Sequence, residues 1–338
     1  MLNSFENILL SKITGIFCNR LKVLFIITIL PNQSTTDSIY MCSGAISNIM
    51  DKPKYIDLRT DFSFKRIFGT DANKDLLIAF LNELFQGRKV IEEIYYNKNE
   101  HVGDTEEMGG VIFDLTCTAD NGEKFIIEVQ RSSQLNFKRR MLYYGSKLIA
   151  DQAPKGSRKK WGYKISEIYV IALMDGFPMP DGERTTKYFH DICLCDRETG
   201  KVFYGHLGFF YIELINFTKE EPELRSGLDS WLFVLKNMST LNKIPLYLRK
   251  PIFEKLFNIA EYSKLNKEEK IMYDTSLKRK WDNEAVLEYA RNEGMEKGKT
   301  EVVSNLLAAN KFSISEIANF AGVSEDFVKK VRTSLKKK

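Results

Sequence analysis

The chain has 338 residues, which is long enough to bury a full core, and its 43% hydrophobic and 28% charged residues are typical of an ordinary soluble globular protein. A net charge of only +5 excludes a strong overall field that would attract nucleic acid, although short basic clusters suit contacts with phosphate. Five cysteines without a CxxC pair and three scattered histidines form no zinc pattern and fit a reduced, cytoplasmic protein.

Residues 1–49 differ from the rest of the chain. An apolar run at 23–30 follows Arg20 and Lys22, and it resembles the core of a signal peptide but is too short to span a bilayer. Met50 opens a plausible start, so we expect residues 1–49 to be an extension that is poorly ordered or results from an upstream start-codon assignment. A short helix near residues 5–30 is the structure that we expect there, and we expect no membrane contact.

The next segment carries polar residues before a helix. Asp61 and Lys65 belong to the run Thr60-Asp61-x-x-Phe64-Lys65-x-x-Phe68-Gly69, where Asp61 suits the N-cap of a helix or a supporting role in a site. Apolar residues at helical spacing predict a helix over 71–85, and residues 90–99 predict a strand.

Two β-rich runs, 111–117 and 124–130, flank Asn121-Gly122, which predicts a β-hairpin. Asp114 lies among apolar residues of the first run, while Glu128 and Gln130 lie two apart in the second and therefore share one face. A carboxylate in an apolar strand is costly, and two neighbouring carboxylates repel each other unless a cation lies between them. A divalent ion that prefers oxygen ligands, such as Mg²⁺, would balance this charge.

The following residues complete an α/β pattern. We expect a helix over 135–150, a buried strand over 167–174, a pair of strands over 188–195 and 201–204, and another strand over 209–215. Together with the hairpin they predict a mixed sheet flanked by helices.

From residue 226 the pattern is helical, with helices expected over 228–236, 251–262, 267–291 and 299–308. The tail has the form of a helix-turn-helix: Ser313 and Ser324 suit N-caps and Gly322 suits the turn. Such a tail contacts DNA or, alternatively, serves as a packing or oligomerisation element. We therefore divide the chain into residues 1–49, 50–225, 226–298 and 299–338.

Asp114 followed by Glu128-x-Gln130 on the next strand resembles the core of the PD-(D/E)xK nucleases. The opening run from Thr60 to Gly69, together with Arg140 and Tyr144 on the following helix, narrows the resemblance to the Rpn-type recombination-promoting nucleases, also described as PD-(D/E)xK family transposases. It covers roughly residues 55–335. One departure from the wider superfamily is that Gln130 occupies the position of the usual lysine.

The resemblance implies a restriction-endonuclease-like core that cleaves DNA with Mg²⁺ or Mn²⁺. Asp114 and Glu128 would hold the metal and Gln130 would join them in catalysis. The candidates for contact with DNA phosphates are Lys65, Arg140 and Tyr144, with Asp61 in support.

We expect a role in recombination or mobile elements, and a homo-oligomer is compatible with the sequence. The alternative is an inactive DNA-binding or protein-interaction module on a nuclease scaffold, because glutamine does not supply the positive charge of lysine. The sequence leaves open the specificity for DNA, the number of metals and the oligomeric state.

Overall fold

The computed structural model describes residues 14–18, 23–27, 53–97, 100–101, 111–112, 114–131, 136–154, 161–179 and 186–335. The chain divides into two compact units, residues 1–52 and 53–338. In the first unit, strands β1 (Thr14–Cys18) and β2 (Val23–Ile27) pair antiparallel, so the helix expected near residues 5–30 is wrong there. β-Branched and aromatic residues in both runs favour strands. The expectation of poor order falls on residues that lie outside the described part.

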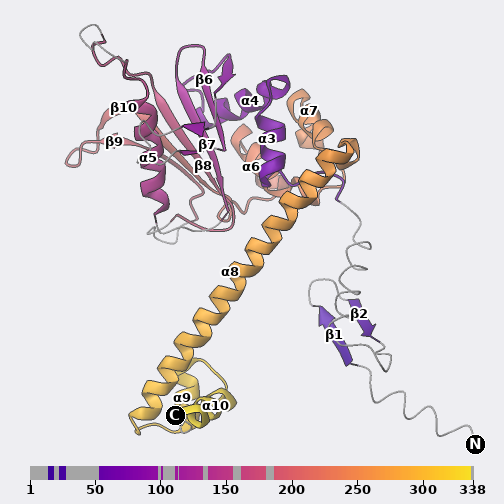
Figure 1. Cartoon of the computed structure of the whole chain (residues 1–338), viewed down its shortest axis with the longest axis vertical. Helices are drawn as coiled ribbons and strands as arrows, with labels where there is room; N and C mark the ends of the chain where they lie inside the picture. The colour runs from indigo at the N-terminus through magenta and orange to yellow at the C-terminus, as the bar shows by residue number, and fades with distance from the viewer. Residues whose placement is uncertain are drawn as a thin grey trace, which may run out of the picture. The chain divides into compact units, whose positions relative to one another are not determined.

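The second unit is built on a six-stranded mixed sheet (Figure 1). Strands β7, β8 and β10 run parallel, and the other pairings are antiparallel. In spatial order the strands are β3 (Ile94–Tyr96), β6 (Leu115–Ala119), β7 (Lys124–Gln130), β8 (Ile168–Met174), β10 (Val202–Glu213) and β9 (Phe189–Cys195). A separate two-stranded sheet pairs β4 (Glu100–His101) with β5 (Val111–Ile112).

The hairpin predicted around Asn121-Gly122 is confirmed for β6 and β7. Gly122 has a φ of +88°, which favours glycine, and its N–H donates to Ala119 O at 2.9 Å. The Asn121 side chain accepts from Glu123 N at 3.0 Å and closes the turn. This turn fixes the register of Leu115 opposite Ile127, and with it the positions of the polar residues at the far end of the hairpin.

Helices cover both faces of the sheet (Figure 1). One face packs against α3 (Asp61–Phe68), α4 (Lys74–Phe85), α6 (Gly227–Asn237) and α7 (Pro251–Ile259) in a large apolar core. The other face packs against α5 (Phe137–Ala150) in a smaller core. Short 3₁₀ turns lie at Asp71–Asn73, Glu221–Glu223, Met238–Thr240, Leu246–Leu248 and Tyr262–Lys264.

Two predicted breaks are absent. The strands expected over 201–204 and 209–215 form the single strand β10, because a bulge between Tyr204 and Gly208 takes up the extra residues without ending the pairing with β9. The helices expected over 267–291 and 299–308 form one helix, α8 (Lys267–Ala308). Gly294 and Gly298 weaken a helix by only about 1 kcal/mol each, and the Lys297–Glu293 pair at 2.7 Å supports it.

The chain ends in α9 (Ile314–Ala321) and α10 (Glu325–Leu335), which pack against the end of α8 around Val303, Ile317 and Val328. Ser313 caps α9 with Glu316, and Gly322 adopts a φ of +58° between the helices, as predicted. The predicted α/β class, a mixed sheet flanked by helices and followed by a helical region, is thus confirmed. None of the described helices is both long enough and apolar enough to cross a bilayer.

Candidate functional site

Asp114 lies directly before β6, so the expectation that it lies inside a strand over 111–117 is wrong. The backbone changes sheets at this point: Ile112 pairs with Glu100 in the small sheet, and Leu115 pairs with Ile127 in the large one. The change of sheets places the Asp114 carboxylate beside the neighbouring strand β7.

Two hydrogen bonds connect Asp114 with β7. The Val129 N–H donates to Asp114 Oδ2 at 2.8 Å, and the Asp114 N–H donates to Glu128 Oε1 at 3.2 Å. The Asp114 carboxylate therefore accepts from the backbone next to Glu128, and the Glu128 carboxylate accepts from the backbone of Asp114. The structure brings Asp114 and Glu128 together, as the hairpin register predicts.

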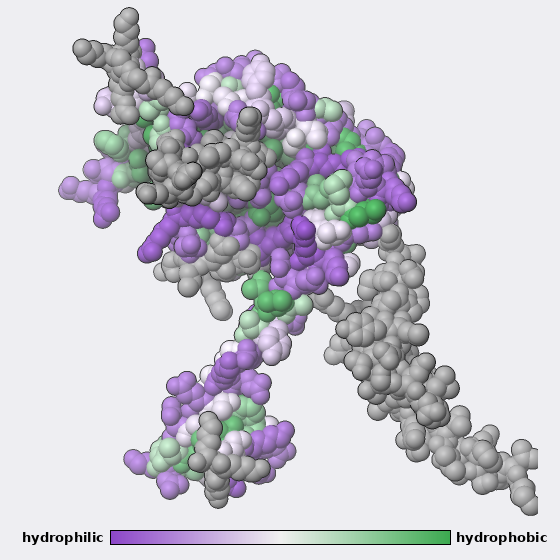
Figure 2. All heavy atoms as spheres, in the orientation of Figure 1, coloured by the Kyte–Doolittle hydropathy of each residue, from purple (hydrophilic) through white to green (hydrophobic). Residues whose placement is uncertain are grey.

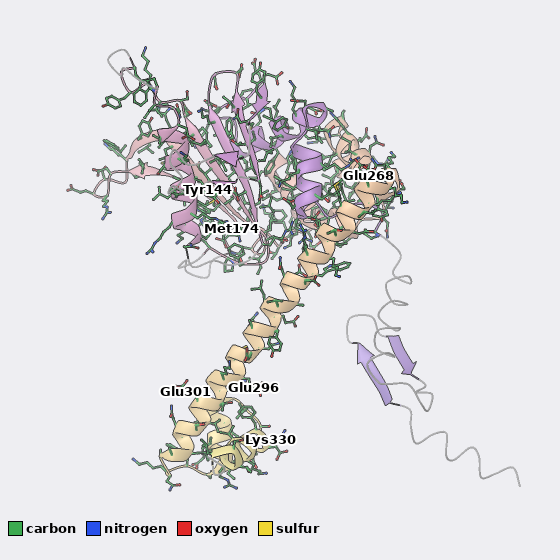
Figure 3. All side chains as sticks on the ribbon, in the orientation of Figure 1. Tyr144, Met174, Glu268, Glu296, Glu301 and Lys330 are labelled. Carbon is green, nitrogen blue, oxygen red and sulfur yellow. The ribbon has the colours of Figure 1, made fainter. Side chains whose placement is uncertain are left out.

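Glu128 and Gln130 project from β7 on the same face as Ile126, which belongs to the core beneath α5. Helix α5 supplies Arg140, whose Nη2 donates to Gln130 Oε1. The Arg140 guanidinium also lies 5.8 Å from the centre of the Tyr144 ring, within the range of a cation–π contact. Figure 3 labels Tyr144 on α5 and Met174 at the end of β8, the residue that pairs with Gln130.

Asp61 and Lys65 reach the site from α3. The N-cap of α3 is Thr60, whose side chain accepts from Ser63 N at 3.2 Å, so the N-cap role considered for Asp61 is wrong. Asp61 is the first helical residue and pairs with Lys65 Nζ at 2.9 Å. Both side chains are about half exposed, and their charges act on the pKa of Asp114.

Burial dominates the electrostatics of the site. It raises the pKa of Glu128 to about 8, with a further increase from the charge of Asp114, while the charges of Arg140 and Lys65 lower it by less. Burial likewise raises the pKa of Asp114. The pKa of the Tyr144 hydroxyl is raised by burial and then by the charge of Glu128. At Glu128, burial and the neighbouring carboxylate thus outweigh the effect of the nearby cations on the pKa.

A pocket of about 210 Å³ opens beside these residues. Its lining comes from α3, from the segment before β6, from the end of β7 and from α8, and comprises Asp61, Phe64, Asp114, Val129, Gln130, Arg131 and Asn283. Sequence reasoning did not identify Arg131 or Asn283. The only signal for Asn283 is its spacing from Ser276 and Lys280, which puts this exposed polar residue on the same helix face as two buried ones.

A family model described as "PD-(D/E)XK nuclease family transposase" matches residues 58–290, which is more than half of the chain. The chain belongs to this family. No curated protein and no solved structure matches it. The matched span contains every residue of the site described above, from Asp61 to Asn283.

The family implies a metal ion, and the donor set fits one. Among the residues that the structure describes, no group of three or more His, Cys, Asp or Glu side chains could hold a metal ion. The site instead offers the carboxylates of half-buried Asp114 and buried Glu128. Mg²⁺ in particular is commonly held by one or two carboxylates together with waters and substrate phosphate oxygens. The carboxylates of Asp114 and Glu128 are thus of the type that holds such an ion.

Proposed function

We propose that the chain is a metal-dependent DNA endonuclease of the PD-(D/E)xK type that acts in recombination or on mobile elements. The observation that carries the proposal is the pair formed by Asp114 and Glu128. Burial and the charge of Asp114 raise the pKa of Glu128 to about 8, so a bound cation would favour ionisation of both groups near neutral pH. Family membership independently supports a nuclease.

Asp114 and Glu128 would hold Mg²⁺ or Mn²⁺. When bound, such an ion supplies positive charge that lowers the pKa of water and stabilises charge on phosphate oxygens. The two backbone hydrogen bonds fix the carboxylates before any ligand arrives, which limits the ordering cost of binding.

The other site residues have roles that follow from their contacts. Arg140 donates to the oxygen of the Gln130 amide and so orients this side chain beside the two carboxylates. Lys65 supplies positive charge beside both carboxylates, and Arg140 does so beside Glu128. Tyr144 positions Arg140 through the face of its ring.

We assign the main DNA contact to the sheet domain rather than to the C-terminal helices. Helix α10 begins with Glu325 and Asp326, which repel phosphates at the end of the helix that a helix-turn-helix protein presents to DNA. Lys329 lies 3.3 Å from Asp326, so its charge is partly balanced. Weak, salt-sensitive DNA contact by residues 299–338 stays a prediction, with packing or oligomerisation as the alternative.

The test is nicking of plasmid DNA in the presence of Mg²⁺. We expect the wild type to nick and Asp114→Ala to lose the activity. Asp120→Ala is the matched control because Asp120 is exposed at the turn of the same hairpin. No nicking by the wild type with Mg²⁺ or Mn²⁺ would favour the inactive scaffold, for which Gln130 in place of the superfamily lysine is the observation in support.

A further inference from the structure

Helix α8 begins beside the sheet domain and is anchored there by side chains on one of its faces. The Tyr273 hydroxyl accepts from the Asp57 N–H at 3.0 Å, and Ser276 Oγ accepts from the Phe62 N–H at 3.4 Å. Lys280 continues this face one turn later and is only 5% exposed. From residue 281 to 298 each residue of the helix is classed as exposed, and Figure 2 shows hydrophobic side chains on this exposed stretch. Lys280 is therefore at the last buried turn before the helix leaves the domain.

Lys280 belongs to a network of two cations and two carboxylates. Its Nζ lies 2.8 Å from Asp57 Oδ2 and 3.3 Å from Asp175 Oδ2. Arg59 closes the network from the other side, with Nε 3.0 Å from Asp57 Oδ1 and Nη1 3.1 Å from Asp175 Oδ1. The four charges cancel, which is the condition under which buried ions are tolerated.

The same network holds the end of β7. The Asp175 N–H donates to Gln130 O at 2.8 Å, and Arg131 Nε donates to Arg59 O at 2.9 Å. The Asp175 side chain thus forms an ion pair with α8, while its backbone N–H forms a hydrogen bond with Gln130 at the end of β7. Asp175 thereby connects Lys280 to the strand that carries Glu128 and Gln130.

Asn283 follows Lys280 by three residues and lines the pocket that contains Asp114 and Gln130. We propose that α8 completes the site: Asn283 contacts the phosphate ligand, and Lys280 is the positioning residue that holds Asn283 and the end of β7 through Asp57 and Asp175. An uncharged amide gives a phosphate oxygen a donor without altering the charge balance of the carboxylates. The identity of the ligand rests on the proposed nuclease function.

The positioning role is tested by hydrogen exchange at the Val129 amide, because that N–H donates to the Asp114 carboxylate. Lys280→Met should speed its exchange at least tenfold, while Lys278→Met, on the exposed side of α8, should leave it unchanged. If Lys280→Met does not fold, Lys280→Met with Asp175→Asn restores neutrality and should still show fast exchange. Wild-type exchange at Val129 in whichever variant folds would overturn the positioning role.

The ligand contact of Asn283 is tested without cleavage, by binding of a short DNA duplex in EDTA. Asn283→Ala should weaken binding about fivefold, the effect of losing one hydrogen bond of about 1 kcal/mol. Asn292→Ala, exposed farther along α8, is the control. Equal affinity of the wild type and Asn283→Ala would overturn the contact. A wild type that never nicks DNA would sink the nuclease proposal but would leave the exchange and binding results intact.

Discussion

Two acidic clusters lie at opposite ends of strands β7 and β8. Glu123 and Glu167 come directly before the first residues of these strands, whereas Glu128 lies near the last residues of β7, beside Asp114. Both clusters pair carboxylates across neighbouring segments. They differ in the cations that the chain places among them.

At the first end the chain supplies the cation. Lys89 Nζ bridges Glu123 and Glu167, and Tyr169 donates to Glu167 at 2.6 Å. Burial alone would raise the pKa of Glu167, but hydrogen bonds from Lys89, Tyr169 and His206 lower it to about 2. In this closed cluster the chain itself supplies the compensating donors, although Glu123 Oε2 is buried without a hydrogen-bond partner among the described residues.

At the other end the balance is reversed. Burial and the charge of Asp114 raise the pKa of Glu128 to about 8, and the charges of Arg140 and Lys65 only reduce that effect. The comparison teaches that an acidic pair points to a ligand when burial and mutual repulsion outweigh the nearby cations, and that acidity alone does not distinguish the two cases.

The largest expected difference between the clusters concerns metal binding. Mutation of a residue that only supports a metal ligand lowers metal affinity by about 10- to 100-fold. Because Glu128 is itself a proposed ligand, Glu128→Gln should lower Mn²⁺ affinity by more than about 100-fold. It should also abolish nicking. Glu167→Gln should leave both unchanged. Titration calorimetry and plasmid nicking measure the two effects. Equal Mn²⁺ affinity of Glu128→Gln and Glu167→Gln would show that the two acidic clusters do not differ in metal binding.

The next difference is the pH dependence of stability in EDTA. Glu128 has a pKa of about 8 when folded against 4.5 in the unfolded chain, so between these values the folded state binds more protons. Its contribution to the free energy of unfolding therefore falls as the pH rises from 4.5 to 8, by up to about 1.4 kcal/mol per pH unit.

Urea unfolding from pH 5 to pH 8 measures this slope as the difference between wild type and Glu128→Gln, which lacks the titrating group. Adding Mg²⁺ should flatten the wild-type slope, because the ion favours the charged carboxylate. A difference between the two proteins that stays constant with pH would contradict the high pKa of Glu128.

A smaller effect of opposite sign is expected at the closed cluster. The folded pKa of Glu167 lies below its ordinary 4.5, so its contribution to stability is present above pH 4.5 and is lost as the pH falls toward 2. Glu167→Gln should lower the free energy of unfolding at pH 7 by about 1 kcal/mol, a figure reduced for solvent screening. Exposed Glu198 gives the control, Glu198→Gln. Unchanged stability of Glu167→Gln would mean that Lys89 does not compensate this carboxylate.

The smallest effect is expected at Lys65. Its charge lowers the pKa of both Asp114 and Glu128, so Lys65→Met should raise both values and weaken Mn²⁺ binding a few-fold at pH 7. Because the ligands must be deprotonated, the loss should shrink as the pH rises. The exposed Lys201, changed to methionine, is the control. A loss that is independent of pH would show that Lys65 acts through packing or direct ligand contact instead.

The local sequence determined most of the elements. Asn121-Gly122 between two β-rich runs predicted the hairpin, and its register brought Asp114 beside Glu128 as expected. Period-2 alternation placed Glu128 and Gln130 on one face. A turn and the alternation of a strand depend only on residues that are close in sequence, so both can be predicted without knowledge of the fold.

The tertiary structure decided what those residues face. Asp114 lies outside β6 because the chain changes sheets there, and the sequence around it reads as one continuous strand. The break expected between the helices over 267–291 and 299–308 is absent, because Gly294 and Gly298 weaken the helix only slightly and the Lys297–Glu293 pair supports it.

Contacts between distant segments are the part that sequence patterns do not contain. Lys280 forms a hydrogen bond with Asp57, which lies 223 positions earlier in the chain. This contact holds α8 against the sheet domain, where Asn283 lines the pocket. Likewise, the sequence shows Glu123, Glu128 and Glu167 as similar acids in or directly before apolar strands. Only the fold brings Lys89 to two of them and leaves the third beside another carboxylate, because charge compensation depends on which side chains meet in space.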